Sequence, residues 1–284
     1  QLKATTNYQL LGDATDDMQM IGNSAALKRV KNEIRKVSNS EANVLILGEN
    51  GTGKELVAQA IHQLSERKEG PFIKIDLGTI HEQLFESEMF GAKKGAYTGL
   101  TKDKVGRMAL ANKGTLFLDE IGNLSLSMQG KILSVLQNRE LIAVGDLIPT
   151  KIDTRLVSAT NLTRDRLQNE NNFRQDLLYR INTVEIELPP LRERKEDIPE
   201  LLQFFIEKYR QKYKLPEIKW ASDLIEKAQK YHWPGNIREL QHAVERGLVM
   251  CQNNELKSTD IIVERQRTQY KSSHPKEELN LEQT

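Results

Sequence analysis

The run GENGTGK at residues 48–54 constrains the fold more than any other feature of this 284-residue chain. It has the spacing of a phosphate-binding loop, in which glycines let successive backbone amides point inward around phosphate oxygens. An apolar segment of strand character precedes it at 43–47, and an amphipathic helical segment follows at 55–64. This order predicts a nucleotide-binding α/β fold. The predicted nucleotide contacts are Gly48, Glu49, Asn50, Gly51, Thr52, Gly53, Lys54 and Glu55.

Lys54 fits the phosphate-loop motif, whereas Glu55 departs from its generic form. Lys54 supplies a mobile cation for the β- and γ-phosphates of a nucleotide. The generic motif continues with Ser or Thr as a magnesium ligand, whereas this chain has Glu55 at that position. The magnesium contact must therefore come from another part of the chain.

The run GTLFLDE at residues 114–120 places two carboxylates at the end of a predicted buried strand. Ligands of open α/β sheets bind at the carboxyl ends of the strands. We predict that Asp119 holds Mg²⁺, directly or through water, and that Glu120 orients and deprotonates the attacking water. Alone, such a pair is often only a charged strand end. Together with the phosphate loop it predicts an ATPase that uses ATP and Mg²⁺.

Strand-like and helical segments alternate over the first two thirds of the chain, which predicts a mostly parallel sheet with helices on both faces. After Pro189 and Pro190 only helical periodicity follows, at 198–213, 224–231 and 237–250, so the second domain should be all-α. We expect Asn236 to cap the last helix through the amide of Glu239. The predicted strands lie at residues 44–47, 72–75, 116–118, 141–144, 156–159 and 184–188. The predicted divisions are a linker at 1–17, an α/β domain at 18–190, a helical domain at 191–264 and a disordered tail at 265–284.

Composition narrows the class of protein further. The 41 Lys and Arg residues nearly balance the 40 Asp and Glu residues. This balance excludes a protein that binds nucleic acid through a broad positive charge alone. No apolar run approaches the roughly 18 residues of a membrane span, and the single Cys251 excludes an intramolecular disulfide. We expect a cytoplasmic protein without membrane contact. Because the chain begins at Gln1 without an initiator Met, we also expect it to be a piece of a longer protein or a processed chain.

Six motifs in order, over roughly residues 20–263, carry a family resemblance. They are GENGTGKELVAQAIH, ESEMFGAKKGAYTGL, GTLFLDEIGNL, FRQDLLYRIN, LPPLRERKEDIP and WPGNIREL. They resemble the central AAA+ ATPase domain of the bacterial enhancer-binding proteins, the NtrC-like activators of sigma-54 RNA polymerase. The resemblance implies a P-loop core with a smaller helical lid, a ring that is usually a hexamer, and ATP hydrolysis that remodels the closed promoter complex. The family usually has Glu at the position of Glu55.

The resemblance also implies roles for residues outside the phosphate loop. Thr160 and Asn161 resemble sensor I, which places a polar group near the γ-phosphate. Arg174 and Arg180 match the arginine fingers, which reach into the site of a neighbouring subunit. Arg238 in WPGNIREL matches sensor II on the lid, which contacts phosphate within its own subunit.

Two positions depart from the family pattern. The family loop GAFTGA, which touches the sigma factor, is GAYTGL here, with residues Gly95, Ala96, Tyr97, Thr98, Gly99 and Leu100. Tyr97 for Phe preserves most of the apolar area, whereas Leu100 for Ala is a larger change. Asp76 replaces an Asn that holds the catalytic Glu in an inactive pose, and an ionised acid would repel Glu120.

The leading hypothesis is an ATP-hydrolysing ring that moves the GAYTGL loops against sigma-54 RNA polymerase holoenzyme. The alternative is a nucleotide-dependent regulatory or assembly module whose diverged loop engages another partner. A monomeric P-loop kinase or small-molecule NTPase leaves Arg174, Arg180 and the lid without a joint purpose. Family members commonly carry a sensory or receiver domain of two-component type and a helix-turn-helix, so we expect DNA contact only through a domain not present in this chain.

Overall fold

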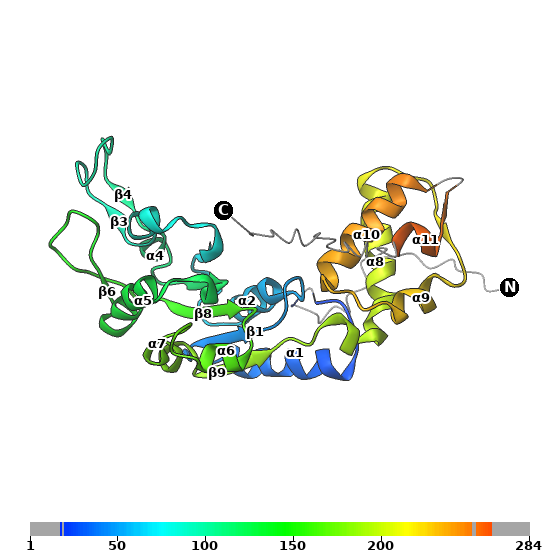
Figure 1. Cartoon of the computed structure of the whole chain (residues 1–284), viewed down its shortest axis with the longest axis horizontal. Coiled ribbons are helices and arrows are strands. Elements are labelled where there is room, and N and C mark those ends of the chain that lie inside the picture. The colour runs from blue at the N-terminus through cyan, green and yellow to red at the C-terminus, as the bar shows by residue number, and fades with distance from the viewer. Residues whose placement is uncertain (1–17, 19, 252–253, 263–284) are drawn as a thin grey trace, which may run out of the picture.

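The computed structural model describes residue 18 and residues 20–251 and 254–262, and its centre is a parallel β-sheet (Figure 1). Within these residues the sheet has five strands in the order β2-β5-β8-β1-β9, and every neighbouring pair is parallel. This confirms the mostly parallel sheet that the alternating pattern predicts. The strands are β1 (Val44–Leu47), β2 (Phe72–Asp76), β5 (Thr115–Asp119), β8 (Arg155–Thr160) and β9 (Val184–Glu187).

Alternate residues of the central strands enter two separate hydrophobic cores. On β1, Leu45 and Leu47 face one core and Val44 and Ile46 face the other, and all four are buried. Helices α1 and α2 cover the second core, while α3 to α7 contribute to the first. Burial on both faces explains why these strands are continuously apolar. The helices are α1 (Ala25–Ser38), α2 (Lys54–Gln63), α3 (Phe85–Met89), α4 (Arg107–Leu110), α5 (Leu126–Asn138), α6 (Arg164–Gln168) and α7 (Gln175–Ile181).

Two hairpins extend from the same end of the α/β domain (Figure 1). One pairs β3 (Gly91–Ala92) with β4 (Lys104–Val105), and the other pairs β6 (Glu140–Leu141) with β7 (Thr150–Lys151). The predicted sheet strand at 141–144 is therefore wrong, because this segment turns away from the sheet. Its Val144 instead forms an isolated bridge with Ala92 of the first hairpin. The sequence of a short apolar run does not show whether it forms a strand of the main sheet or part of a separate hairpin.

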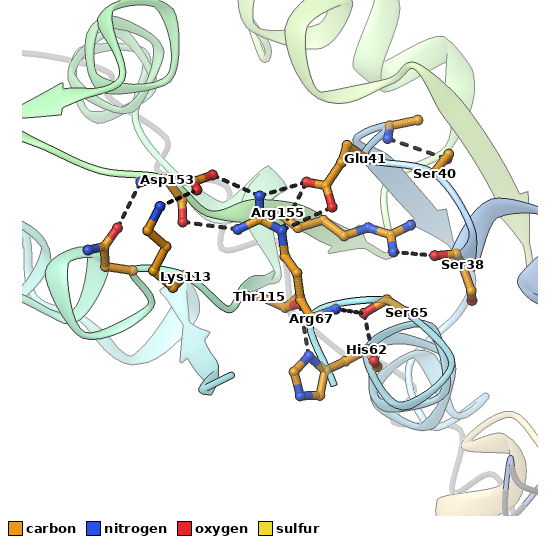
Figure 2. A network of polar contacts seen from close by, with 12 residues as sticks. Ser38, Ser40, Glu41, His62, Ser65, Arg67, Lys113, Thr115, Asp153 and Arg155 are labelled. Atoms are coloured by element: carbon orange, nitrogen blue, oxygen red, sulfur yellow. Dashed lines mark hydrogen bonds and ion pairs between the residues drawn. The ribbon is translucent and has the colours of Figure 1, made fainter. Parts of the chain in front are cut away.

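A polar network joins helices to strands at the amino-terminal end of the sheet (Figure 2). Arg155, the first residue of β8, is buried and donates to the carbonyls of Val37 at 2.7 Å and Ser38 at 3.0 Å. Its charge is favourable at the carboxyl end of α1. His62 Nδ1 lies 2.9 Å from Thr115 Oγ1, and burial together with the Arg155 charge lowers the pKa of His62. The network fixes the end of the sheet opposite the phosphate loop.

After β9 the chain forms a helical lid with its own core (Figure 1). Trp233 is buried in this core and donates to the Ala228 carbonyl at 2.7 Å. The three helices predicted from periodicity are confirmed. The lid contains α8 (Ile198–Lys212), α9 (Leu224–Lys230), α10 (Asn236–Met250) and α11 (Ser258–Ile261), with a short parallel pair formed by β10 (Lys219–Trp220) and β11 (Glu255–Leu256).

A buried carboxylate attaches the lid to the α/β domain. Asp197 accepts the amides of Asn23 at 2.8 Å and Ser24 at 2.7 Å, and it also accepts the Ser24 hydroxyl at 2.7 Å. Gly22 has φ +127°, and a Cβ there would lie 2.5 Å from the carboxyl carbon of Asp197. Only glycine permits this close approach. The start of the lid is therefore held against the start of α1.

The predicted linker at 1–17 lies outside the described residues, as does the predicted tail at 265–284. The predicted boundary at 190–191 stays a prediction, and the chain passes there from β9 into a 3-10 helix, η4 (Leu191–Glu193). In the part of the chain that the structure describes, no helix has both the length and the apolar character required to cross a membrane.

Candidate functional site

The phosphate loop connects the end of β1 to the start of α2. Lys54 is the first residue of α2 and is only 7% exposed, and its Nζ donates to the Gly48 carbonyl at 2.9 Å. Gly51 and Gly53 have φ values of +80° and +108°, a conformation that favours glycine. The strand, loop and helix therefore have the order that phosphate binding requires.

Asp119 and Glu120 lie at the carboxyl end of β5, next to this lysine. Glu120 Oε1 is 3.4 Å from Lys54 Nζ. Glu120 has φ +56°, a left-handed conformation that is uncommon for residues other than glycine. Its Oε2 is buried and has no hydrogen-bond partner among the described residues. A buried carboxylate oxygen without a partner indicates a position for water or ligand.

Lys74 on β2 brings a second ammonium group to this site, and it was not among the predicted site residues. Its Nζ lies 2.6 Å from Glu55 Oε2 and 3.6 Å from Asp119 Oδ2. Partial burial opposes the charge, but the hydrogen bond to Glu55 and the nearby carboxylates raise the pKa of Lys74 overall. Lys74 therefore offsets the negative charge of Glu55. The sequence feature that could have identified Lys74 is a lysine within an otherwise apolar strand.

Asp76 ends β2 and lies opposite Asp119 in the parallel register. Its carboxylate accepts the Gly78 amide at 3.0 Å and caps the short 3-10 helix η1 (Leu77–Thr79). The backbone therefore gives Asp76 a partner on its own turn. The predicted repulsion of Glu120 by Asp76 stays a prediction.

Thr160, the last residue of β8, lies beside the phosphate loop. Its carbonyl accepts the Gly48 amide at 3.3 Å, which joins β8 to the first loop residue. The Thr160 side chain is buried and accepts the Leu162 amide at 3.1 Å, whereas Asn161 is exposed. The predicted sensor pair is thus at the carboxyl end of β8, beside the phosphate loop.

Arg174 and Arg180 lie at the two ends of α7, and both are exposed. The Arg174 guanidinium pairs with Asp176 at 3.0 and 2.7 Å. Arg180 Nη2 donates to the Leu136 carbonyl at 2.8 Å. Each guanidinium group therefore has an acceptor within its own chain.

The start of α10 rests on the phosphate loop. The amides of Ile237 and Arg238 donate to the Gly51 carbonyl at 3.0 and 3.4 Å. The Arg238 side chain is exposed, and a Cβ on Gly51 would lie 3.0 Å from Arg238 Cβ. The residue predicted as sensor II is therefore next to the loop of its own chain.

The predicted Asn236 cap is wrong. Gly235 is the N-cap of α10, and Asn236 is the first helical residue, with φ +53°. Glu239 does return to this turn, where it accepts the Gly235 amide at 2.8 Å. The Asn236 side chain instead donates to Glu49 and to the Asn50 carbonyl, which are 187 and 186 residues away in the chain. A local motif cannot reveal such a contact.

The GAYTGL segment at 95–100 forms the tip of the first hairpin. Gly95 and Gly99 have φ values of +81° and +92°, and a Cβ on either would meet no atom within 4 Å. The Gly95 amide donates to the Leu100 carbonyl at 3.0 Å, which closes the tip. Tyr97 is 41% exposed. The tip is thus open, with an accessible aromatic side chain.

The second hairpin supports the first. The Lys93 amide donates to the Val144 carbonyl, and the Val144 amide donates to the Gly91 carbonyl, both at 2.9 Å. Leu147, near the tip of the second hairpin, is 92% exposed. The sequence patterns gave no indication of this hairpin, because its apolar residues read as a buried strand.

The carboxylates at this edge fit a magnesium ion. Asp119 Oδ1 accepts the Glu120 amide at 3.1 Å, and Glu120 Oε2 is the unpartnered buried oxygen described above. In the described part of the chain, no group of three or more His, Cys, Asp or Glu side chains could hold a metal by itself. Protein-bound Mg²⁺ commonly uses one or two carboxylates together with substrate phosphates and water.

The class of protein follows from the strand order and the lid. Counted along the chain, the strands of the main sheet as described lie in the order 2-3-4-1-5, and a separate helical domain rests on the phosphate loop. This architecture is that of the AAA+ ATPases, and the model of the AAA+ ATPase lid domain matches residues 192–278.

Comparison with known proteins gives the family. The model of the sigma-54 interaction domain matches residues 20–187, so this chain belongs to that family. The Nif-specific regulatory protein of Herbaspirillum seropedicae is 44% identical over 252 residues, which cover 89% of this chain and 46% of that protein. The anaerobic nitric oxide reductase transcription regulator NorR of Aeromonas salmonicida is 45% identical over 233 residues, which cover 82% of this chain and 46% of that protein. The family resemblance that the motifs carry is confirmed.

A solved structure supports the same fold. NtrX from Brucella abortus, in complex with ADP, matches with a TM-score of 0.80 and 32% identity, covering 88% of this chain and 56% of that one. A second NtrX structure contains ATP and has a TM-score of 0.79. The chain spans about half the length of the curated relatives described here.

Proposed function

We propose that this chain hydrolyses ATP and uses the energy to remodel sigma-54 RNA polymerase. The observation that carries the proposal is the contact between Lys54 and Glu120, 3.4 Å apart at the carboxyl edge of the sheet. The loop glycines and Lys54 bind the phosphates, and Glu120 takes the proton of the attacking water. Glu120 is close enough to the lysine to act at the same phosphate group.

Asp119 is the residue that would hold Mg²⁺. When bound, the ion offsets the charge that develops on the phosphate oxygens. Lys74 lies 3.6 Å from the same carboxylate, so this ammonium group would compete with the ion for Asp119. The Thr160 and Asn161 pair orients the attacking water, and Arg238 binds phosphate from the lid.

Arg174 and Arg180 complete the site of a neighbouring subunit in a hexameric or similar ring. Both are exposed on α7 and bonded to groups that a phosphate can replace. Guanidinium groups stabilise the charge of the transferring phosphoryl group. The nucleotide site is then shared between two subunits, so assembly controls hydrolysis.

The GAYTGL tip is the contact with the sigma factor. An exposed aromatic on a glycine-flanked tip can act as an anchor in a partner's pocket, and Tyr97 has this exposure. The second hairpin holds the first through the Val144 bridge, so the two hairpins should move together. We place this activity in the bacterial cytoplasm, where RNA polymerase acts.

Sigma-54 capture tests this function. Purified chain would be incubated with sigma-54 in ADP·AlFx, in ADP and without nucleotide, and complexes would be separated by size. We expect capture only with ADP·AlFx, and at least about tenfold weaker capture by Tyr97→Ala. Tyr97→Ala should keep wild-type ATPase activity. Failure of the wild-type chain to capture sigma-54 in every nucleotide state would remove the sigma factor from the proposal, and loss of ATPase activity in Tyr97→Ala would give the loop a structural role.

A further inference from the structure

The carbonyl oxygens of the phosphate loop are held by residues that follow the main sheet in the chain. Three consecutive loop residues, 50–52, accept such hydrogen bonds. In order, Asn50 O accepts Asn236 Nδ2 at 3.0 Å, Gly51 O accepts the Ile237 amide at 3.0 Å and the Arg238 amide at 3.4 Å, and Thr52 O accepts Arg194 Nη2 at 2.9 Å. The loop is therefore bonded along one side to the lid and to the segment that leads into it.

These bonds determine where the loop amides point. In a planar trans peptide the C=O of one residue and the N–H of the next point in opposite directions. Carbonyls turned toward the lid therefore turn the amides of Gly51, Thr52 and Gly53 away from it. Inward-facing amides are the groups that bind phosphate oxygens in such loops.

The side chain of Glu49 joins the same contact. Arg192 of η4 donates to both Glu49 oxygens, at 2.8 and 2.6 Å, and Asn236 Nδ2 donates to Oε2 at 3.0 Å. The Arg192 hydrogen bond, supported by Asn236, lowers the pKa of Glu49. A bidentate guanidinium pair fixes direction as well as distance. The Glu49 side chain thus faces the lid.

Asn236 is the centre of this arrangement. It is 0% exposed, and while its Nδ2 bonds the loop, its Oδ1 accepts the Leu191 amide at 2.8 Å. Its φ of +53° is one that Asn tolerates better than most residues. The close approach also requires Gly51, because a Cβ there would lie 2.3 Å from the Gly235 carbonyl.

We propose that Asn236, with Glu49 and Arg192, is a positioning group through which the lid holds the phosphate loop in its phosphate-binding shape. The inference rests on the proposed nucleotide function and adds a residue-level link between lid orientation and nucleotide affinity. A lid that moves away releases the carbonyls of residues 50–52, and the amides behind them lose their alignment. Nucleotide binding and lid position are then linked in both directions.

The test uses Asn236→Gly and Asn236→Ala in the full chain. Glycine tolerates the left-handed backbone but has no side chain, so it separates backbone strain from the lost hydrogen bonds. We expect both variants to bind a fluorescent ADP analogue about tenfold more weakly than wild type, since three side-chain hydrogen bonds are lost. The matched control is Glu207→Gln, which alters an equivalent Arg–Glu pair with Arg210 on α8, and it should bind as wild type does.

Amide hydrogen exchange without nucleotide supplies a second measurement. In Asn236→Gly, a peptide that covers residues 48–53 should exchange faster, whereas a peptide from α8 should exchange as in wild type. Glu49→Gln leaves the lid backbone unchanged and should lower affinity about threefold. The inference is overturned if Asn236→Gly binds nucleotide with wild-type affinity and its loop amides exchange at the wild-type rate. If Asn236→Gly unfolds the lid, Glu49→Gln decides the question, and wild-type affinity of that variant overturns the inference. Failure of the wild-type chain to bind any nucleotide would refute the proposed function instead.

Discussion

Glu120→Gln should tighten ATP binding while it slows hydrolysis steeply. The change keeps the shape of the side chain and removes its charge. The Glu120 carboxylate lies 3.4 Å from the Lys54 ammonium, so it competes with the phosphates for this cation. Gln competes less, and Lys54 becomes free to bind phosphate.

The size of the effect follows from the ion pair. At this separation the Coulomb energy is about 5 kcal/mol for an effective dielectric constant of about 20. The Lys54 side chain is 7% exposed and the Glu120 side chain 20%, so desolvation of the two groups cancels most of this energy and leaves on the order of 1 kcal/mol. Lys54 also keeps its bond to the Gly48 carbonyl. We therefore expect ATP to bind about threefold to tenfold more tightly, with hydrolysis about 10²- to 10⁴-fold slower because the general base is lost.

The assay combines equilibrium titration of a fluorescent ATP analogue with single-turnover hydrolysis. Glu41→Gln is the matched control, since it alters a carboxylate paired with Arg67 at the opposite end of the sheet. It should change neither quantity. Binding of ATP by Glu120→Gln that is several-fold weaker than wild type would refute the competition for Lys54, and unchanged hydrolysis would refute the role of Glu120 as base.

Three further predictions concern the subunit contact, the metal and the pH dependence of stability. An Arg174→Ala subunit mixed with a Lys54→Ala subunit should recover ATPase activity, because each lacks one half of a shared site; confirmed co-assembly without recovery would contradict catalysis in trans. Lys74→Met should weaken ATP binding in EDTA about threefold to tenfold and MgATP binding less, because the cation that offsets Glu55 and Asp119 is lost; equal losses in the two titrations would argue against this role. The hydrogen bond from Arg67 lowers the pKa of Asp153 from 3.8 to about 2, so the ionised carboxylate stabilises the fold above about pH 4 and this contribution is lost as the pH falls toward 2. Urea unfolding of wild type and Asp153→Asn should differ by about 1 kcal/mol or less near pH 6 and converge near pH 2, since Asp153 is partly exposed; a difference that does not change with pH would refute the assignment.

The sequence predicted the parts of the site that local constraints determine. The phosphate loop needs glycines at fixed spacing between a strand and a helix, and Gly51 and Gly53 have the positive φ values that this spacing implies. Asp119 and Glu120 follow an apolar strand, and such a strand ends at the ligand-binding edge of a parallel sheet. These features lie within short segments, so no tertiary contact was needed to recognise them.

The contacts that the sequence did not reveal join distant segments. Lys74 on β2 reaches Glu55 on α2, 19 residues earlier, and the local pattern of neither segment indicates this contact between a strand and a helix. Asn236 fits a helix-capping pattern, but a buried contact with the phosphate loop determined its conformation. The apolar run of the second hairpin begins with Leu141 in the first core, but its last residue, Val144, pairs with Ala92 of the other hairpin.

The formation of open complexes at a sigma-54 promoter is the most direct test of the proposed remodelling activity. A fluorescent base placed at the transcription start would report DNA melting when the chain and ATP are added to a preformed closed complex. We predict melting with the wild-type chain and ATP, and none with Glu120→Gln or with a non-hydrolysable ATP analogue. A wild-type chain that hydrolyses ATP under these conditions and leaves the promoter closed would contradict the account.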